Sequence, residues 1–265
     1  MLSGLIIYSS KDKERNHYFI NKCLGFFADK DVSVVYKDEK DVFDYLRKNV
    51  VHFVIYRGRD YELVEQLERL GIKCFNNSYT NKIANDKFLT CKFLNEQNIP
   101  CIQSYESPDE IGCYPTVMKS IDGHGGQEVF LVSSRQQAEA ISKRLKKRFV
   151  YQQFYKNNGD LRLYVVNKKV IGAVHRHSNA DFRSNFSLGG EVKSYEPEKE
   201  IVDLAVKVAT ILDADYIGVD FMKVDDKWLI NEIEDPVGCR MLYVASNIDA
   251  IELFLDYVYA FLYDK

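Results

Sequence analysis

The stretch IGVDFMKVDDKWLINEIE, residues 217–234, most constrains the fold, because apolar alternation flanks a polar turn on both sides. This pattern is typical of two antiparallel strands joined by a tight loop. With a three-residue loop at 225–227, Asp220 lies opposite Glu232, and the two-residue period of a strand places Glu234 on the same face. Since like charges opposite each other destabilise a sheet, three such carboxylates indicate a bound cation, with Mg²⁺ as the natural candidate. A solvated sheet face with scattered acids is the alternative for this ribbon alone.

Composition bounds the class of protein. A chain of 265 residues that is 46% hydrophobic can bury a large core, in one large domain or two to three small ones. A net charge of −3 gives no reason to expect nucleic acid or an anionic membrane as the main partner. The apolar run at 5–8 is too short for a signal peptide or a membrane span. The six cysteines lack C-x-x-C spacing, which favours free thiols in a reducing cytoplasm.

The first third of the chain alternates strands and helices, which predicts a small parallel α/β domain over residues 1–82. Strands are expected at 4–9, 32–36, 51–56 and 73–75, and helices at 11–29, 41–48 and 61–70. The first strand-to-helix turn, Ser9-Ser10-Lys11-Asp12, lacks a G-x-G-x-x-G fingerprint, which argues against a dinucleotide-binding domain. Residues 76–79 (Asn-Asn-Ser-Tyr) are predicted to form a linker.

The remainder mixes hairpins with helices. Helices are expected at 85–97, 134–147, 198–212 and 249–262, and hairpins within 114–132, 150–177 and 217–234. A three-residue loop at 167–169 pairs Asp160 with Arg176 and places both on one face with Arg162. These groups can bind a ribose hydroxyl and phosphate oxygens. A cross-strand salt bridge worth about 0.2–1 kcal/mol is the alternative.

Two loops carry further candidate groups. Gly123, Gly125 and Gly126 follow a strand that ends near Lys119, so backbone amides and an ammonium can converge on a phosphate. An ordinary glycine hairpin with a surface lysine is the alternative, and the spacings of the Walker A and kinase loops are absent. The second loop, residues 181–190, presents Arg183 and Asn185 before a double glycine. It is either a functional loop or a structural loop pinned by its two phenylalanines.

Together these segments resemble the ATP-grasp ligase superfamily, and within it most closely the RimK-like glutamate ligases. The resemblance covers the whole chain and implies an ATP-grasp fold of mixed α/β and α+β class. Residues 1–82 are similar to the pre-ATP-grasp domain, and residues 83–149 and 150–265 to the two α+β lobes that clamp ATP. The matching motifs occur in the family's order: Asn85-Asp86-Lys87, Val117-Met118-Lys119, Tyr151-Gln152-Gln153-Phe154-Tyr155, Gly159-Asp160-Leu161-Arg162, Phe182-Arg183-Ser184-Asn185, Gly218-Val219-Asp220 and Asn231-Glu232-Ile233-Glu234.

The resemblance implies a role for each matching residue. It implies that Lys87 and Lys119 contact the ATP phosphates, and that the hinge Gln152, Gln153, Phe154 and Tyr155 holds adenine through backbone groups. It implies that Asp160 binds the ribose, that Arg162 lies near the transferred phosphate, and that Arg183 and Asn185 contact phosphate and substrate. The implied ligands of Mg²⁺, with Mn²⁺ as a substitute, are Asp220, Glu232 and Glu234.

The chain departs from the family pattern at three places. Gln153 stands where glutamate is usual, and Glu234 stands where asparagine is usual, which adds a negative charge to the metal site. The usual Pro-Gly is replaced by residues 235–240 (DPVGCR), so the substrate pocket is expected to differ here. Arg176 and Arg240 are candidates for a substrate carboxylate, which arginine can bind through two hydrogen bonds. A structural ion pair is the alternative for Arg240.

The implied activity is ATP- and Mg²⁺-dependent joining of a carboxylate to an amine through an acyl phosphate. Small-molecule or peptide substrates, a cytoplasmic location and a possible homo-oligomer accompany this expectation. One alternative is a D-alanine–D-alanine-type ligase acting on free amino acids. Another is a nucleotide-binding regulatory module that has lost catalysis.

Overall fold

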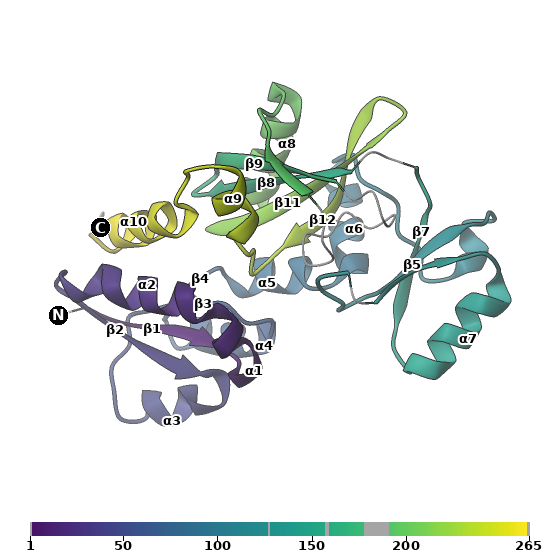
Figure 1. The fold of residues 1–265 in the computed structure, drawn as a ribbon. Coiled ribbons are helices and arrows are strands. Elements are labelled where there is room, and N and C mark those ends of the chain that lie inside the picture. Colours follow the sequence, from purple (N-terminus) through teal and green to yellow (C-terminus); the bar gives the residue numbers. More distant parts are fainter. Residues whose placement is uncertain (1, 127, 157–158, 178–190, 264–265) are drawn as a thin grey trace.

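The computed structural model describes residues 2–126, 128–156, 159–177 and 191–263 (Figure 1). Within these ranges the strands form three sheets, ordered β2-β1-β3-β4, β10-β9-β8-β11-β12 and β6-β5-β7. The three-stranded sheet lies at the opposite end of the molecule from the N-terminal sheet, and the five-stranded sheet lies between them (Figure 1). No helix in the described ranges is both long and apolar enough to cross a membrane.

The N-terminal sheet is parallel, as the alternation of strands and helices predicts. Its strands are β1 (Leu2–Tyr8), β2 (Val32–Asp38), β3 (Phe53–Tyr56) and β4 (Lys73–Phe75), and its helices are α1 (Ser10–Lys13), α2 (His17–Ala28), α3 (Val42–Leu46) and α4 (Tyr61–Arg69). Successive residues of β1 enter different cores: Ile6 packs with α2, and Leu5 and Ile7 pack with α3 and α4. Burial on both faces explains why the sequence of β1 reads as a continuous apolar run.

The single helix predicted over 11–29 is wrong, because a 3₁₀ turn at Glu14–Asn16 separates α1 from α2. The Asn16 side-chain amide donates to the backbone carbonyl of Asp12 at 2.8 Å. An asparagine side chain that bonds to a nearby backbone group competes with the regular hydrogen bonds of a helix and can interrupt it. The spacing of the apolar residues continues across this interruption, so the sequence pattern did not reveal it.

The linker predicted at residues 76–79 is also wrong. Asn77 caps helix α5 (Ser78–Ala84) by accepting from the Thr80 N–H at 2.7 Å. Asn76 is buried, and its amide oxygen accepts from the N–H groups of Asp215 and Tyr216 at 2.6 and 2.8 Å. Asparagine is common both in turns and at helix N-caps, because its side chain bonds to the backbone in both. The two asparagines therefore did not distinguish a flexible linker from a well-anchored connection.

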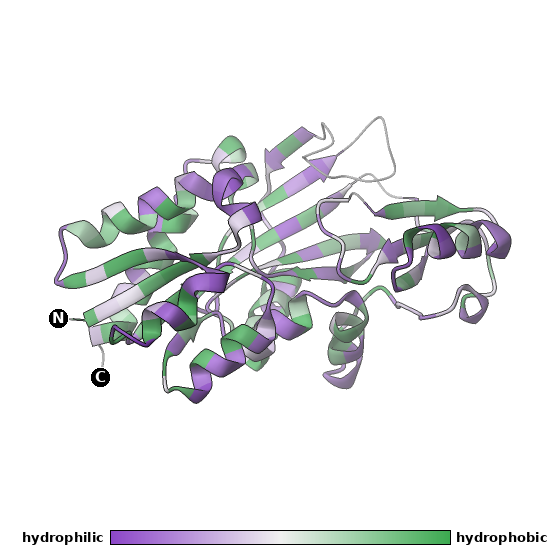
Figure 2. Ribbon diagram, turned by 90° about the horizontal axis from the view of Figure 1, so that it is seen from below, coloured by the Kyte–Doolittle hydropathy of each residue, from purple (hydrophilic) through white to green (hydrophobic). Residues whose placement is uncertain are grey.

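The five-stranded sheet is antiparallel and holds the acidic ribbon at one edge. Its strands are β8 (Asp160–Val166), β9 (Lys169–His177), β10 (Glu191–Ser194), β11 (Tyr216–Val224) and β12 (Lys227–Glu234). One face packs against α8 (Lys199–Ile211), and the other packs against α9 (Arg240–Ala245) and α10 (Ala250–Tyr263). Figure 2 shows hydrophobic and hydrophilic residues alternating along the helices, as expected for helices that cover a sheet.

Both predicted three-residue hairpin loops are two residues long in the structure. Asn167-Lys168 and Asp225-Asp226 all have positive φ angles, which is the conformation of a tight type I′ turn. Next to each shorter loop, the strands pair one residue out of the predicted register. An irregularity in the pairing restores the predicted register further along each hairpin, between Tyr164 and Val165 in one and between Asp220 and Phe221 in the other. The predicted pairs of Asp220 with Glu232 and of Asp160 with Arg176 are therefore correct, although the predicted loop lengths are not.

The third sheet contains β5 (Thr116–Ser120), β6 (Val129–Val132) and β7 (Phe149–Gln153), covered by α7 (Arg135–Leu145). Helix α6 (Lys87–Glu96) begins at a lysine whose backbone N–H bonds to Ile121 beyond β5, so it links this sheet to the rest of the molecule. The strand–glycine loop–strand pattern predicted for 114–132 is confirmed.

Asn76→Ala is expected to lower the free energy of unfolding by about 2–4 kcal/mol, because two buried N–H groups lose their acceptor and each costs about 1–3 kcal/mol. Urea denaturation followed by circular dichroism measures this. Asn49→Ala is the matched control, since Asn49 is exposed and makes one bond to a local carbonyl. Equal midpoints for the two variants would contradict the role assigned to Asn76.

Candidate nucleotide and metal site

A cleft of about 860 Å³, partly open to solvent, lies where the three-stranded and five-stranded sheets meet. The structure brings most of the sequence-predicted site residues to its wall. Those that line it are Lys87, Lys119, Gly123, Gly125, Gly126, Gln152, Gln153, Phe154, Tyr155, Asp160, Arg176, Asp220, Glu232 and Glu234.

The other predicted residues lie elsewhere. Arg162 lies behind the cleft wall, paired with Asp220 and Glu234. Arg240 is exposed at the start of α9 and lies outside the cleft lining among the described residues. Arg183 and Asn185 fall outside the described residues.

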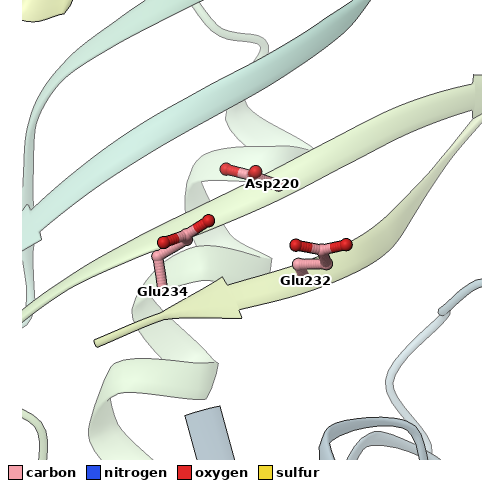
Figure 3. A group of neighbouring side chains, drawn as sticks. All are labelled: Asp220, Glu232 and Glu234. Carbon is pink, nitrogen blue, oxygen red and sulfur yellow. The ribbon is translucent and has the colours of Figure 1, made fainter. Parts of the chain in front are cut away.

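Three carboxylates form a compact group at one end of this cleft (Figure 3). Asp220 comes from β11, and Glu232 and Glu234 come from the neighbouring strand β12. Each contributes an oxygen atom, and these three atoms all lie within 4.8 Å of one another. Carboxylate oxygens at this separation are suitable ligands for a hard cation such as Mg²⁺.

Buried cations hold the acid cluster together. Arg162 donates to both oxygens of Asp220 at 2.6 Å, and its Nη2 atom also reaches Glu234 Oε1 at 2.8 Å. Arg176 Nη2 donates to Asp220 Oδ2 at 2.6 Å. Lys119 Nζ bonds to Glu232 Oε1 at 3.0 Å. Each carboxylate therefore has at least one cationic partner, which offsets the repulsion that the sequence pattern implies.

These contacts also set the ionisation of the acids. Burial by itself raises the pKa of Glu232, but the ammonium groups of Lys119 and Lys87 more than offset this and hold its pKa well below the usual range. Burial likewise opposes ionisation of Asp220, and Arg162 and Arg176 bring its pKa below the usual value. Both groups are therefore carboxylates at neutral pH, which is the form that binds metal ions.

The glycine-rich loop closes over this end of the cleft. Gly125 and Gly126 have φ angles of +66° and +72°, which side chains with a Cβ adopt at a cost. A Cβ on Gly123 would lie 2.1 Å from Ser120 Oγ, so a side chain there would displace the Ser120 hydroxyl from its bond to Glu128. Lys87 Nζ donates to the Gly123 carbonyl and thereby joins α6 to the loop.

The other end of the cleft is formed by the end of β7 and the residues after it. Gln152 is buried, and its amide donates to Ser104 Oγ at 2.8 Å. The segment that contains Ser104 also pairs with β7, because Tyr105 and Tyr151 exchange two backbone hydrogen bonds of 2.9 and 2.8 Å. Gln152 is thus held from behind, and residues 152–155 line the cleft.

Sequence reasoning missed the apolar wall of the cleft and one polar group. Ile102, Val117, Val129 and Met222 line it, together with Asn231, whose Oδ1 atom accepts from Lys119 Nζ at 3.1 Å. The sequence could have predicted Met222 as a cleft residue, since it lies two residues from Asp220 on the same strand. Ile102 lies outside every predicted element, so no pattern indicated it.

A second, smaller cavity adjoins the acids. Lys87, Asn231, Glu232 and Glu234 line both spaces, and His124 lines only the second. Burial, with Arg59 and Lys87, lowers the pKa of His124 to about 3, so its imidazole is neutral at neutral pH.

The glycine-rich loop, Lys87, Lys119 and the three acids thus line one cleft at the junction of two sheets, an arrangement that fits an ATP-grasp enzyme. The family model described as "RimK-like ATP-grasp domain" matches residues 80–258. The chain belongs to the RimK-like ATP-grasp family, which makes it an ATP-dependent carbon–nitrogen ligase, as the sequence predicts.

Individual relatives agree with this assignment. A probable alpha-L-glutamate ligase of Sodalis glossinidius is 29% identical over 77% of this chain and 74% of the relative. The ATP-grasp ligase PsnB, solved with a phosphomimetic variant of its minimal precursor, Mg and ADP, shares the fold with a TM-score of 0.74, at 15% identity over 98% of each chain. D-alanine–D-alanine ligase from Bacillus anthracis, solved with ATP, gives a TM-score of 0.72 at 16% identity, over 91% of this chain and 88% of that chain. These structures confirm the predicted ATP-grasp fold.

Arg162→Met is expected to lower the free energy of unfolding by about 3–5 kcal/mol, because it leaves Asp220 buried with only part of its compensating charge. Magnesium chloride is expected to restore more stability to this variant than to the parent protein, since a bound cation takes over the missing charge. Urea denaturation with and without the salt measures both effects.

Arg135→Met serves as the matched control, because Arg135 forms exposed ion pairs with Asp109 and Glu139. Its loss is expected to cost less than about 1 kcal/mol. The same response to magnesium in both variants would argue against a cation site at the acid cluster.

Proposed function

We propose that the cleft binds ATP with Mg²⁺ and that the protein activates a substrate carboxylate as an acyl phosphate, which an amine then attacks. The observation that carries this proposal is the placement of Lys87 and Lys119 beside the acid cluster, in the same cleft that residues 152–155 line at its other end. Such a cleft has an anion-binding end and an apolar end, as a nucleoside triphosphate requires.

The adenine is proposed to lie against residues 152–155, between the apolar side chains of Ile102, Val117 and Met222. Backbone groups at the end of a strand can form the hydrogen bonds to the base. Gln153, which stands where glutamate is usual, is therefore compatible with this role. Asp160 also lines the cleft and is proposed to bind the ribose.

The donor set of the acid cluster fits a divalent cation. Asp220, Glu232 and Glu234 supply carboxylate oxygens within one ion's reach of each other, and hard cations prefer such ligands. When bound, Mg²⁺ would supply positive charge that offsets the negative charge of the nucleotide phosphates. Glu234, which replaces the usual asparagine, adds a charge, and we propose that it strengthens metal binding.

The residues of this chain then act by position and charge. Lys87 and Lys119 hold the outer phosphate oxygens, while Arg162 keeps Asp220 and Glu234 oriented from behind. In the first step a carboxylate oxygen of the substrate attacks the γ-phosphorus, and ADP leaves. In the second step the amine attacks the acyl carbon, expels phosphate and loses a proton. Phosphoryl transfer of this kind needs alignment more than a covalent protein group.

Several finer assignments belong to this proposal. We propose a division into residues 1–82, 83–149 and 150–265, with the last boundary near the start of β7. The names of the glutamate ligase relatives make L-glutamate the first amine to test. The likeness to D-alanine–D-alanine ligase concerns the fold alone and does not favour D-alanine. We also propose a cytoplasmic location and substrates that are small molecules or peptides.

A coupled ADP-release assay with pairs of acids and amines, including L-glutamate and D-alanine, tests the activity directly. Glu232→Gln is expected to reduce ADP release by at least about 100-fold, because it removes both a metal ligand and the partner of Lys119. The exposed Glu96→Gln variant is the control and should retain full activity. ATP binding without ADP release for every pair would favour the regulatory alternative.

Glu234→Gln is expected to raise the magnesium concentration needed for half-maximal ADP release by about tenfold or more, because the site loses a charged ligand. Titration of magnesium after removal of metal with EDTA measures this change. An unchanged magnesium dependence would remove Glu234 from the metal site and leave the ligase assignment standing.

A further inference from the structure

Two buried thiols lie behind the cleft and share two amide side chains. Asn95 Nδ2 donates to Cys91 Sγ at 3.4 Å, and Cys101 Sγ donates to Asn95 Oδ1 at 3.7 Å. Gln103 bridges the same pair, since its Nε2 atom donates to Cys101 Sγ at 3.5 Å and its Oε1 atom accepts from Cys91 Sγ at 4.0 Å. The two sulfur atoms are therefore neighbours, one from helix α6 and the other from the segment that follows it.

The cover over this pair is thin and polar. Cys91 and Cys101 are only 5% and 7% exposed, whereas Asn95 and Gln103 are exposed. The two amides also bond to each other through two contacts of 3.0 Å. The two thiols are therefore bonded to side chains that reach the solvent, and this is the side from which a small oxidant would approach.

The environment prepares the two thiols for different roles. The Cys101 thiol hydrogen-bonds to Cys91 and lowers the pKa of Cys91 to about 6, and the Ser104 N–H adds a further bond to that sulfur at 3.2 Å. The same contact, with burial, raises the pKa of Cys101. The lowered pKa favours the thiolate of Cys91, which is the nucleophilic form and no longer donates to Gln103, while Cys101 keeps its proton. The buried Cys23 and Cys74 differ, because burial raises their pKa values.

We propose that Cys91 and Cys101 form an oxidisable thiol pair that closes to an intramolecular disulfide in the presence of hydrogen peroxide. The Cys91 thiolate attacks one peroxide oxygen, which forms a sulfenic acid and releases hydroxide. The Cys101 sulfur then attacks the Cys91 sulfur, forms the S–S bond and releases water, with its proton going to the departing oxygen.

The pair is connected to the nucleotide cleft on two sides. Ser104, whose N–H bonds to Cys91, also accepts from the Gln152 amide at 2.8 Å. Ile102 follows Cys101, lines the cleft, and is bonded through its N–H to Ile230 on strand β12 at 2.8 Å. A disulfide makes Cys91 Sγ a weaker acceptor for the Ser104 N–H and ties this segment covalently to α6. Oxidation therefore weakens ATP binding several-fold, a consequence that rests on the proposed function.

Peptide mapping tests the site itself. The protein is treated with hydrogen peroxide, blocked with N-ethylmaleimide and digested, and mass spectrometry is expected to find residues 91 and 101 joined by a disulfide. Cys113, which is the exposed cysteine, provides the control: Cys113→Ser should leave the linked peptide unchanged, and Cys91→Ser should abolish it. Free, alkylated Cys91 and Cys101 after oxidation of the parent protein would overturn the proposal, and this measurement needs no variant to fold.

Titration of Mg-ATP into oxidised and reduced protein tests the coupling. The expected result is weaker binding after oxidation, recovery with dithiothreitol, and no change in Cys91→Ser. Equal affinity of the two forms would overturn the link to the cleft. No ATP binding by either form would overturn the proposed function instead, while the peptide map would still decide the thiol pair.

Discussion

The buried pairing of Arg162 with Asp220 is the interaction on which the candidate site depends. The two residues lie directly opposite each other on the neighbouring strands β8 and β11, and the guanidinium group contacts both carboxylate oxygens. A carboxylate that is 2% exposed is otherwise too costly to keep ionised. With the charge of Asp220 balanced from behind, the three acids can line the cleft together, where a cation and phosphates are proposed to bind.

A second polar cluster ties the N-terminal sheet to the end of the acidic strand. Asp235 follows Glu234, and its two carboxylate oxygens accept from Asn76 and Asn81 at 2.9 Å each. Its backbone carbonyl accepts from Asn85 at 2.7 Å, two residues before Lys87. Asp235 therefore has a structural role, because it fastens the end of β12 to helix α5 and to the residues on either side of it. Substitutions in this cluster should act on the position of Glu234 as well as on stability.

Much of this could be predicted from the sequence, because local patterns determine it. The period of two in a strand placed Asp220, Glu232 and Glu234 together, and strand–helix alternation predicted the parallel sheet. Glycines at 123, 125 and 126 indicated a loop that approaches its neighbours closely. The resemblance added the family, and the family match over residues 80–258 confirmed it.

The sequence by itself determined which side chains share a face, because that depends only on backbone geometry a few residues long. Only the tertiary structure decided what those side chains meet. The one-residue shifts that restore both hairpin registers, the burial of Asn76 and the amides shared by Cys91 and Cys101 all arise from contacts between segments distant in the chain or from exact loop geometry. Their energies depend on packing and on hydrogen-bond satisfaction, which no local pattern encodes.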